Sequence, residues 1–261
     1  MGGSIMELNL KGKIALVCGG SKGLGKACAT ALAREGAKVA ICARGKESLD
    51  SAAKEIGAFA VQCDVTRPED REKTISEVMQ KLGGIDILVN NSGGPPAGSF
   101  ESHDMTTWHS AVELSFLSAV DFARLVLPGM RSRKTGRIIN ITSYGALEYI
   151  PGLILSSSIR PSVVAWTRAL AREVGPDNVG VVAICQGLFR TERLKKLIQK
   201  RADESGKTFN EAEKAWVDEI PLGRMGEPSE LGDLVAFLAS EKAGYITGAA
   251  IAIEGGIMRR L

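Results

Sequence analysis

Short apolar runs that alternate with helical stretches constrain the fold of this chain more than any other feature. Continuous runs of four to eight apolar residues are typical of parallel strands that are buried on both faces of a sheet. Six runs rich in valine and isoleucine fall at Ile14–Cys18, Val39–Cys42, Phe59–Cys63, Ile85–Asn90, Arg137–Ile141 and Val179–Ile184. A seventh run, Ala249–Ile253, completes the set.

Helical patterns separate these runs and fix the fold class. Pro68 followed by acidic residues is a typical helix start, and Gly36 and Gly83 are typical stops. Regular alternation of strand and helix predicts an α/β fold: a single-domain, doubly wound, Rossmann-type, seven-stranded parallel sheet with helices on both faces. No linker or repeat divides the 261 residues, so one domain is expected over residues 1–261. The expected helices are Gly23–Glu35, Lys46–Glu55, Pro68–Lys81, Thr107–Arg131 and Ser162–Val174.

A lid-like insertion is expected at about 188–221, after the sixth strand. This connection is long for an α/β fold, where a few residues are usual, and it carries helical patterns around Thr191–Ala202 and Asn210–Ile220. Long insertions at the carboxyl edge of a sheet often cover a substrate. The cations of this insertion either form a solvated face or attract an acidic substrate or a phosphopantetheine carrier. They are Arg190, Arg193, Lys195, Lys196, Lys200 and Arg201.

Composition and charge exclude several function classes. The net charge is only +3, and no basic patch with interleaved aromatic residues predicts nucleic-acid binding. No apolar stretch approaches the roughly 18 residues of a membrane span, and the first residues lack the pattern of a signal peptide. The five cysteines have no metal-site spacing. We therefore expect a cytoplasmic protein without bound metal, membrane span or nucleic-acid partner.

A glycine-rich loop follows the first strand and opens the first helix. Its glycines allow the backbone to approach a pyrophosphate, and the helix N-terminus offers unpaired N–H groups with positive potential. The pattern G-x-x-x-G-x-G in this position predicts a dinucleotide site. Its residues are Gly19, Ser21, Lys22, Gly23, Leu24 and Gly25.

The end of the second strand indicates which dinucleotide binds. An acidic residue there would accept hydrogen bonds from the adenosine ribose, but Ala43 occupies the position and Arg44 follows it. Arg44 and Lys22 favour a 2′-phosphate, hence NADP (NADPH), with NAD less favoured. The alternative is that both are ordinary solvated side chains.

Polar residues also close the third and fourth strands at the same edge. Asp64-Val65 and Asn91-Ser92-Gly93 fall where open α/β sheets bind ligands. Asp64 could accept a hydrogen bond from an adenine amine, or it could be a cap or turn residue.

These motifs resemble the short-chain dehydrogenase/reductase family, most closely its 3-oxoacyl-(acyl-carrier-protein) reductase-like branch. The resemblance runs from about residue 11 to residue 256 and rests on C-G-G-S-K-G-L-G (18–25), D-V (64–65), N-N-S-G (90–93), G-R-I-I-N-I-T-S (136–143) and Y-I-T-G with E-G-G (245–256). It implies an NADP(H)-dependent oxidoreductase acting on a carbonyl or alcohol, possibly 3-oxoacyl-like. It also implies cofactor contacts at Gly187 and Phe189 and a homo-oligomer, expected to be a tetramer, built on the helices Thr107–Arg131 and Ser162–Val174.

The active site of the family carries Asn, Ser, Tyr and Lys, and this chain keeps one of the four. Ser143 matches the serine at the end of the fifth strand. Thirteen residues later Ser156 stands at the tyrosine position, and four further on Arg160 stands at the lysine position. Ser115, seven residues after a tryptophan, stands at the asparagine position.

The replaced residues change the chemistry that is expected. Carbonyl reduction needs a proton donor, which a tyrosine with a lysine-lowered pKa provides; a serine hydroxyl is far less acidic, and arginine does not release its proton. Arg160 could hold ribose hydroxyls or a substrate carboxylate, and Ser143 could polarise a carbonyl. Tyr149 is the candidate substitute donor, with a packing or surface role as the alternative.

Two functional hypotheses follow from these patterns. The first is an NADP(H)-dependent oxidoreductase with an altered active site and a small-molecule substrate. The second is a catalytically impaired cofactor-binding protein with a regulatory or partner-binding role. Because proline is disfavoured inside a helix, Pro161 further predicts a helix that begins near Pro161 and leaves residues 156–160 partly non-helical.

Overall fold

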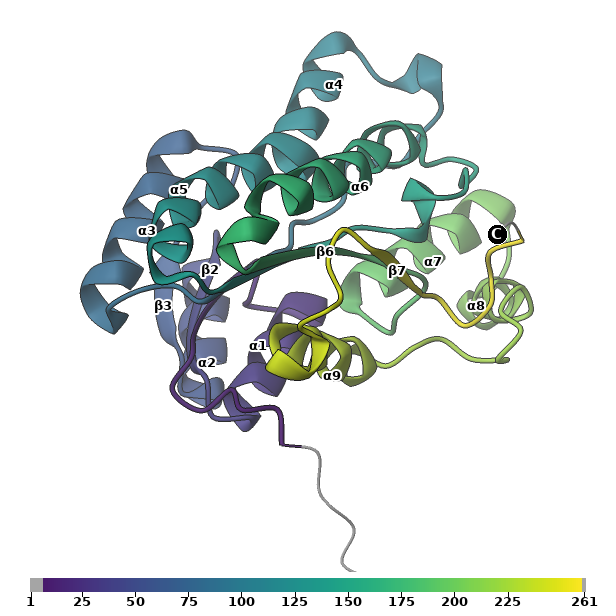
Figure 1. Cartoon of the computed structure of the whole chain (residues 1–261). Coiled ribbons are helices and arrows are strands. Elements are labelled where there is room, and N and C mark those ends of the chain that lie inside the picture. The colour runs from purple at the N-terminus through teal and green to yellow at the C-terminus, as the bar shows by residue number, and fades with distance from the viewer. Residues whose placement is uncertain (1–6, 260–261) are drawn as a thin grey trace, which may run out of the picture.

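A seven-stranded parallel sheet forms the centre of the molecule in the computed structural model, which describes residues 7–259. The strand order is β3-β2-β1-β4-β5-β6-β7, and all neighbouring pairs are parallel (Figure 1). The predicted fold class is confirmed. The strands are β1 Ile14–Cys18, β2 Lys38–Ala43, β3 Phe59–Gln62, β4 Ile87–Asn90, β5 Gly136–Ile141, β6 Val179–Gln186 and β7 Ala250–Ile253.

The direction of the winding reverses between β1 and β4. The chain builds β1, β2 and β3 outward to one side and then returns to add β4 to β7 on the other. In open α/β sheets, ligands bind beyond the carboxyl ends of the strands at such a switch point. The crevice therefore lies next to the loops that follow β1 and β4.

Helices cover both faces of the sheet (Figure 1). Helices α1, α2 and α9 bury alanine, leucine and valine against one face, and α3, α5 and α6 pack on the other. The helices are α1 Gly23–Arg34, α2 Lys46–Ile56, α3 Pro68–Leu82, α4 Met105–Val112, α5 Ser118–Arg133, α6 Ile154–Val174, α7 Glu192–Ser205, α8 Phe209–Val217 and α9 Pro228–Ala239. None of the helices within residues 7–259 is both long and apolar enough to cross a membrane.

The insertion after β6 forms two helices with a small apolar core of their own. Helices α7 and α8 correspond to the two expected helical patterns, and Leu194, Ile198 and Ala212 are buried between them. Thr191 and Thr208 cap the two helices through their side-chain oxygens. The insertion is thus an ordered element beside the carboxyl edge.

The prediction that a helix begins near Pro161 is wrong. Helix α6 begins at Ile154, so residues 156–160 are helical and Pro161 lies inside the helix. Leu155 and Ile159 are buried against α4 and the segment that follows it, and this packing offsets the hydrogen bond that proline cannot donate. The Ser162 hydroxyl donates to the Ile159 carbonyl oxygen within the same turns.

The expected long helix over Thr107–Arg131 is interrupted. A π-helical turn, Glu113–Leu117, joins α4 to α5 and contains the buried Ser115. Such turns inside α-helices are frequent at functional sites.

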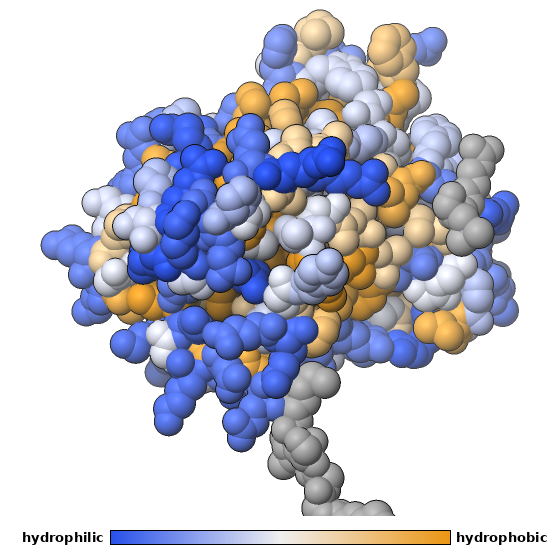
Figure 2. Space-filling view, in the orientation of Figure 1, coloured by the Kyte–Doolittle hydropathy of each residue, from blue (hydrophilic) through white to orange (hydrophobic). Residues whose placement is uncertain are grey.

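The edge strand β7 is less buried than the rest of the sheet. All four of its residues are apolar, yet Ala252 is exposed and the other three are half-buried. Figure 2 shows hydrophobic residues reaching the surface near the centre of the view, whereas hydrophilic residues dominate the left and lower margins.

Candidate functional site

The glycine loop after β1 is held in a shape that only small residues permit. A Cβ atom on Gly25 would lie 2.2 Å from the Gly19 carbonyl oxygen, and Gly19 has a φ of 61°. Asn91, just after β4, donates from its side-chain nitrogen to the Cys18 carbonyl oxygen at 3.1 Å. The structure therefore brings the predicted loop and Asn91 together at the switch point.

This loop fits the phosphates of a dinucleotide. The N-cap of α1 is Lys22, whose side chain forms no capping hydrogen bond, so the first amides of the helix remain available to an anion. A Cβ atom on Gly93 would meet no atom within 4 Å, which leaves open space above the loop that follows β4. The residues of the glycine loop would hold the pyrophosphate, and bound NADPH would supply the hydride.

The end of β2 presents positive charge and has no acid at position 43, although Arg44 lies near enough to Asp64 to help lower the pKa of that carboxyl. Ala43 is buried, while Arg44 and Lys22 are exposed. Within the described residues neither cation forms an ion pair, in contrast with Lys46, which pairs with Asp50 at 2.9 Å. Both side chains are free to reach a phosphate at this corner of the crevice.

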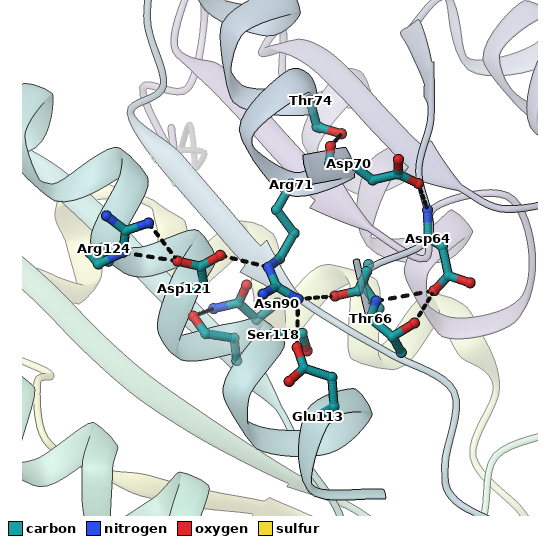
Figure 3. A network of polar contacts seen from close by, with 12 residues as sticks. Asp64, Thr66, Asp70, Arg71, Thr74, Asn90, Glu113, Ser118, Asp121 and Arg124 are labelled. Atoms are coloured by element: carbon teal, nitrogen blue, oxygen red, sulfur yellow. Dashed lines mark hydrogen bonds and ion pairs between the residues drawn. The ribbon is translucent and has the colours of Figure 1, made fainter. Parts of the chain in front are cut away.

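Asp64 has the turn role that its sequence position allowed. Its Oδ1 accepts hydrogen bonds from the Thr66 amide at 3.0 Å and the Thr66 hydroxyl at 2.8 Å (Figure 3). Although burial raises its pKa, these hydrogen bonds bring the pKa of Asp64 below its ordinary value. The carboxylate is fixed in place, and the adenine contact stays a prediction.

A buried arginine connects this corner to the π-helical turn. Arg71 donates to the Val65 carbonyl oxygen at 2.6 Å, to Glu113 at 2.7 Å and to Asp121 at 2.7 Å (Figure 3). Its side chain is only 5% exposed. No local sequence pattern predicts this network, because its partners lie 42 and 50 residues away from Arg71.

Ser143 lies just after the end of β5, and Ser115 lies in the π-helical turn. The Ser143 hydroxyl oxygen accepts from the Gly145 amide at 3.1 Å, which leaves its proton free to donate. The Ser115 hydroxyl is buried without a hydrogen-bond partner among the described residues. It lines a cavity of about 20 Å³ together with Asn91, Ser92 and Val65, which has room for one water molecule.

Ser156 and Arg160 occupy one face of α6. Ser156 is 8% exposed and Arg160 is 7% exposed. The Arg160 guanidinium donates to the Ile141 carbonyl oxygen at 3.4 Å, a long hydrogen bond at the end of β5. Burial, together with the charge of Arg193, lowers the pKa of Arg160 to about 10.

Arg193 reaches back from α7 to the loop after β4. Its two terminal nitrogens donate to the Gly94 and Pro95 carbonyl oxygens at 3.0 and 3.2 Å. Arg193, one of the cations of the expected lid, therefore connects the insertion to the loop after β4.

The remaining predicted residues lie less directly at the crevice. Tyr149 is 63% exposed and lines a separate pocket of about 200 Å³, whose α6 residues are Ile154, Ser157, Ser158 and Pro161. Gly187 lies close to Glu254: a Cβ atom added to Gly187 would lie 2.6 Å from the Cα atom of Glu254. The ring of Phe189 is buried in the core against Gly226.

Comparison with known proteins supports a nucleotide-dependent reductase. A family model described as enoyl-(acyl carrier protein) reductase matches residues 19–258. The chain is 33% identical over 252 residues to a 3-oxoacyl-(acyl-carrier-protein) reductase of Vibrio cholerae, covering 96% of this chain and 99% of the relative. It is 35% identical to an acetoacetyl-CoA reductase of Shinella zoogloeoides, covering 94% and 98%.

A solved structure supports the same relationship. The structure of L-sorbose reductase from Gluconobacter frateurii, complexed with NADPH and L-sorbose, is similar with a TM-score of 0.92 and 31% identity. The similarity covers 98% of this chain and 100% of that one.

Proposed function

The chain belongs to the short-chain dehydrogenase/reductase family, and we propose that it is an NADP(H)-dependent oxidoreductase with an atypical active site. The observation that carries the proposal is the glycine loop held by Asn91 beside Arg44 and Lys22, which form no ion pair within residues 7–259. The names of the relatives support a carbonyl or alcohol substrate, since they include reductases of 3-oxoacyl and acetoacetyl thioesters.

NADPH is favoured over NADH at this site. A 2′-phosphate would receive charge-assisted hydrogen bonds from Arg44 and Lys22, and the 2′-hydroxyl of NADH would find no carboxylate at Ala43. The solved relative that was complexed with NADPH agrees with this choice.

The reaction moves a hydride and a proton. The hydride would pass from NADPH to the carbonyl carbon, and the carbonyl oxygen would take up a proton to become a hydroxyl, with NADP⁺ as the second product. Ser143 has a free hydroxyl proton with which to polarise the carbonyl oxygen. Ser156 cannot act as a tyrosine-like acid, and Arg160 remains protonated at neutral pH although its pKa falls to about 10.

Turnover of simple ketones is therefore expected to be low. Losing a positioned acid costs a factor of roughly 10²–10⁴ in rate. Tyr149 stays the candidate substitute donor, although its pocket is lined by the side of α6 that carries Ser157 and Ser158.

The test has two parts. NADPH and NADH are titrated by calorimetry, and NADPH oxidation is then followed with ketones, quinones and 3-oxoacyl thioesters. We expect tighter binding of NADPH and slow turnover that Ser143→Ala lowers further, by about 10²-fold. Tyr149→Phe lowers turnover only if Tyr149 supplies the proton.

Other results would change the proposal. Equal or tighter NADH binding contradicts the cofactor choice. NADPH binding without turnover of any compound favours the alternative, a cofactor-binding protein with a regulatory or partner-binding role. Rates of roughly 1–10³ per second on ordinary 3-oxoacyl substrates contradict the impaired site.

A homo-oligomer, specifically a tetramer, is part of the proposal. The apolar edge strand β7 and the exposed Leu117 beside α5 support it, because a partner copy would remove this surface from water. A light-scattering mass close to one chain at micromolar concentration would contradict the assembly.

A further inference from the structure

The start of α7 lies directly against the glycine loop. A Cβ atom on Gly23 would lie 3.5 Å from the Cγ2 atom of Thr191, which is the N-cap of α7. The same loop also contacts Asn91, whose side chain donates to the Cys18 carbonyl oxygen. The loop that would hold the pyrophosphate therefore touches both the insertion and the segment that follows β4.

Arg193 joins these two neighbours of the glycine loop to each other. Its terminal nitrogens donate to the carbonyl oxygens of Gly94 and Pro95 at 3.0 and 3.2 Å. Arg193 follows Thr191 by two residues, and Gly94 follows Asn91 by three. The glycine loop, the start of α7 and the loop after β4 thus form a closed ring of contacts, and the Arg193 guanidinium is part of that ring.

No carboxylate of the described residues balances the charge of Arg193. The adjacent Glu192 pairs with Lys195 at 3.0 Å, and Arg193 forms no ion pair within residues 7–259. By contrast, Arg190 at the start of the same insertion has two carboxylate partners at 3.2 Å. Carbonyl oxygens orient a guanidinium but do not neutralise its charge, so this cation is held in place and remains available to an anion.

Arg193 also has donors left for such an anion. A guanidinium carries five N–H donors, and the two bonds to carbonyl oxygens leave the others unused. A Cβ atom on Gly93 would meet no atom within 4 Å, so open space borders the residue next to Gly94. Phosphate oxygens match the paired donors of a guanidinium.

We propose that Arg193 binds the pyrophosphate of the dinucleotide, so that the insertion supplies one cation of the cofactor site. This inference rests on the proposed function, to which it adds a cofactor-binding residue from outside the glycine loop. The pyrophosphate would receive hydrogen bonds from the first amides of α1 and from the guanidinium of Arg193.

The proposed role differs from that of Arg44 in the part of the cofactor that is held. The pyrophosphate is common to NADPH and NADH, whereas only NADPH carries the 2′-phosphate. Loss of Arg193 should therefore weaken both dinucleotides alike, and loss of Arg44 should weaken NADPH alone.

The test titrates NADPH, NADH and adenosine 2′-monophosphate by calorimetry. Adenosine 2′-monophosphate carries the 2′-phosphate but no pyrophosphate. Arg193→Met should weaken NADPH and NADH equally, by about tenfold or more, and leave adenosine 2′-monophosphate unchanged. Arg44→Ala should give the opposite pattern, with weaker binding of NADPH and of adenosine 2′-monophosphate and unchanged binding of NADH.

Further variants separate the charge of Arg193 from its packing. Methionine keeps an unbranched chain without charge, so Arg193→Lys should lose less affinity than Arg193→Met. Because salt screens an exposed charge, the difference between wild type and Arg193→Met should shrink as the salt concentration rises. Arg190→Met, whose charge is already paired, and Lys196→Met, exposed on α7, should bind both dinucleotides as the wild type does.

Gly94 provides an independent way to displace Arg193. A Cβ atom at this position would lie 2.4 Å from a terminal nitrogen of Arg193, which is the far end of a flexible side chain. Gly94→Ala should therefore weaken both dinucleotides, by less than Arg193→Met. It should have no further effect in the Arg193→Met background, because the two changes act on one contact. Gly94→Ala and Arg193→Lys carry the test if Arg193→Met does not fold.

Three results would overturn the inference while leaving the proposed function intact. The first is unchanged affinity of Arg193→Met for both dinucleotides. The second is a loss confined to NADPH, which would assign Arg193 to the 2′-phosphate. The third is a loss that is equal in Arg193→Lys and Arg193→Met and independent of salt, which would assign Arg193 to packing alone. A wild type that binds neither dinucleotide would instead overturn the proposed function, and the inference with it.

Discussion

The two halves of the carboxyl edge differ in how completely the protein satisfies its own polar groups. On the β1–β3 side, the amide of Asn91 holds the glycine loop, Thr66 fixes Asp64, and Arg71 is fully paired. Where β4 and β5 meet, Ser115 has no partner among the described residues in a cavity also lined by Asn90 and Asn140, and Arg160 has one long bond at the end of β5. The first half is preorganised by the chain itself, whereas the second keeps unused hydrogen-bonding groups.

This contrast separates two kinds of recognition. Binding of a dinucleotide is specified by backbone shape and a few charges, so the same cofactor site can serve many reactions. The groups that contact the reacting part of a substrate set its chemistry, and the candidates in this chain include Arg160, which forms no ion pair among residues 7–259.

The largest expected effect comes from removing the charge that stabilises the preorganised half. Arg71→Met leaves Glu113 and Asp121 without their buried partner and should lower the free energy of unfolding by about 3–5 kcal/mol. Denaturant unfolding measures the change. Arg124→Met removes the exposed partner of Asp121 and is the control, with an expected loss of about 1 kcal/mol or less. Equal losses in both variants would show that burial of Arg71 has no special role.

The next prediction restores the family's acid to the incomplete half. Ser156→Tyr combined with Arg160→Lys should raise turnover of neutral ketones by about 10²-fold, the lower end of what a positioned acid contributes. Ser156→Tyr alone should gain less, because arginine keeps its proton and cannot pass one on to the tyrosine after each turnover. NADPH affinity is measured in parallel. No gain in turnover at unchanged NADPH affinity would mean that the substitution does not reconstruct the proton donor.

A smaller effect is expected from the cofactor corner. Arg44→Ala should weaken NADPH binding by about 1–3 kcal/mol and leave NADH binding unchanged, because only NADPH carries the 2′-phosphate. Calorimetric titration of both cofactors measures the difference. Lys46→Ala is the control, since Lys46 is already paired with Asp50. An equal loss of affinity for NADH would show that Arg44 contacts a part of the dinucleotide that NADH and NADPH share, and not the 2′-phosphate.

The two halves also differ in what the sequence could predict. The strands were predicted because buried parallel strands appear as continuous valine and isoleucine runs, and the glycine loop because its spacing reflects a local backbone shape. The pairing of Arg71 with Glu113 and Asp121 depends on the tertiary fold and leaves no local pattern. The start of α6 was predicted wrongly because proline propensity was weighed without the packing of Leu155 and Ile159, which only the folded chain provides.

The smallest prediction concerns the turn that fixes Asp64. Thr66→Val removes the hydroxyl bond to the carboxylate but keeps the bond from the backbone amide, so the free energy of unfolding at pH 7 should fall by about 0.5–1.5 kcal/mol. The pKa of Asp64 is lowered in the folded protein, so its stabilising contribution is present above the unfolded pKa and is lost as the pH falls through the folded pKa. The difference between wild type and variant should therefore shrink as the pH is lowered, and a carboxyl NMR titration should show a higher Asp64 pKa in the variant. A difference that is constant with pH would mean that the Thr66 hydroxyl acts through packing, and the preorganisation of this corner would then rest on the backbone amide alone.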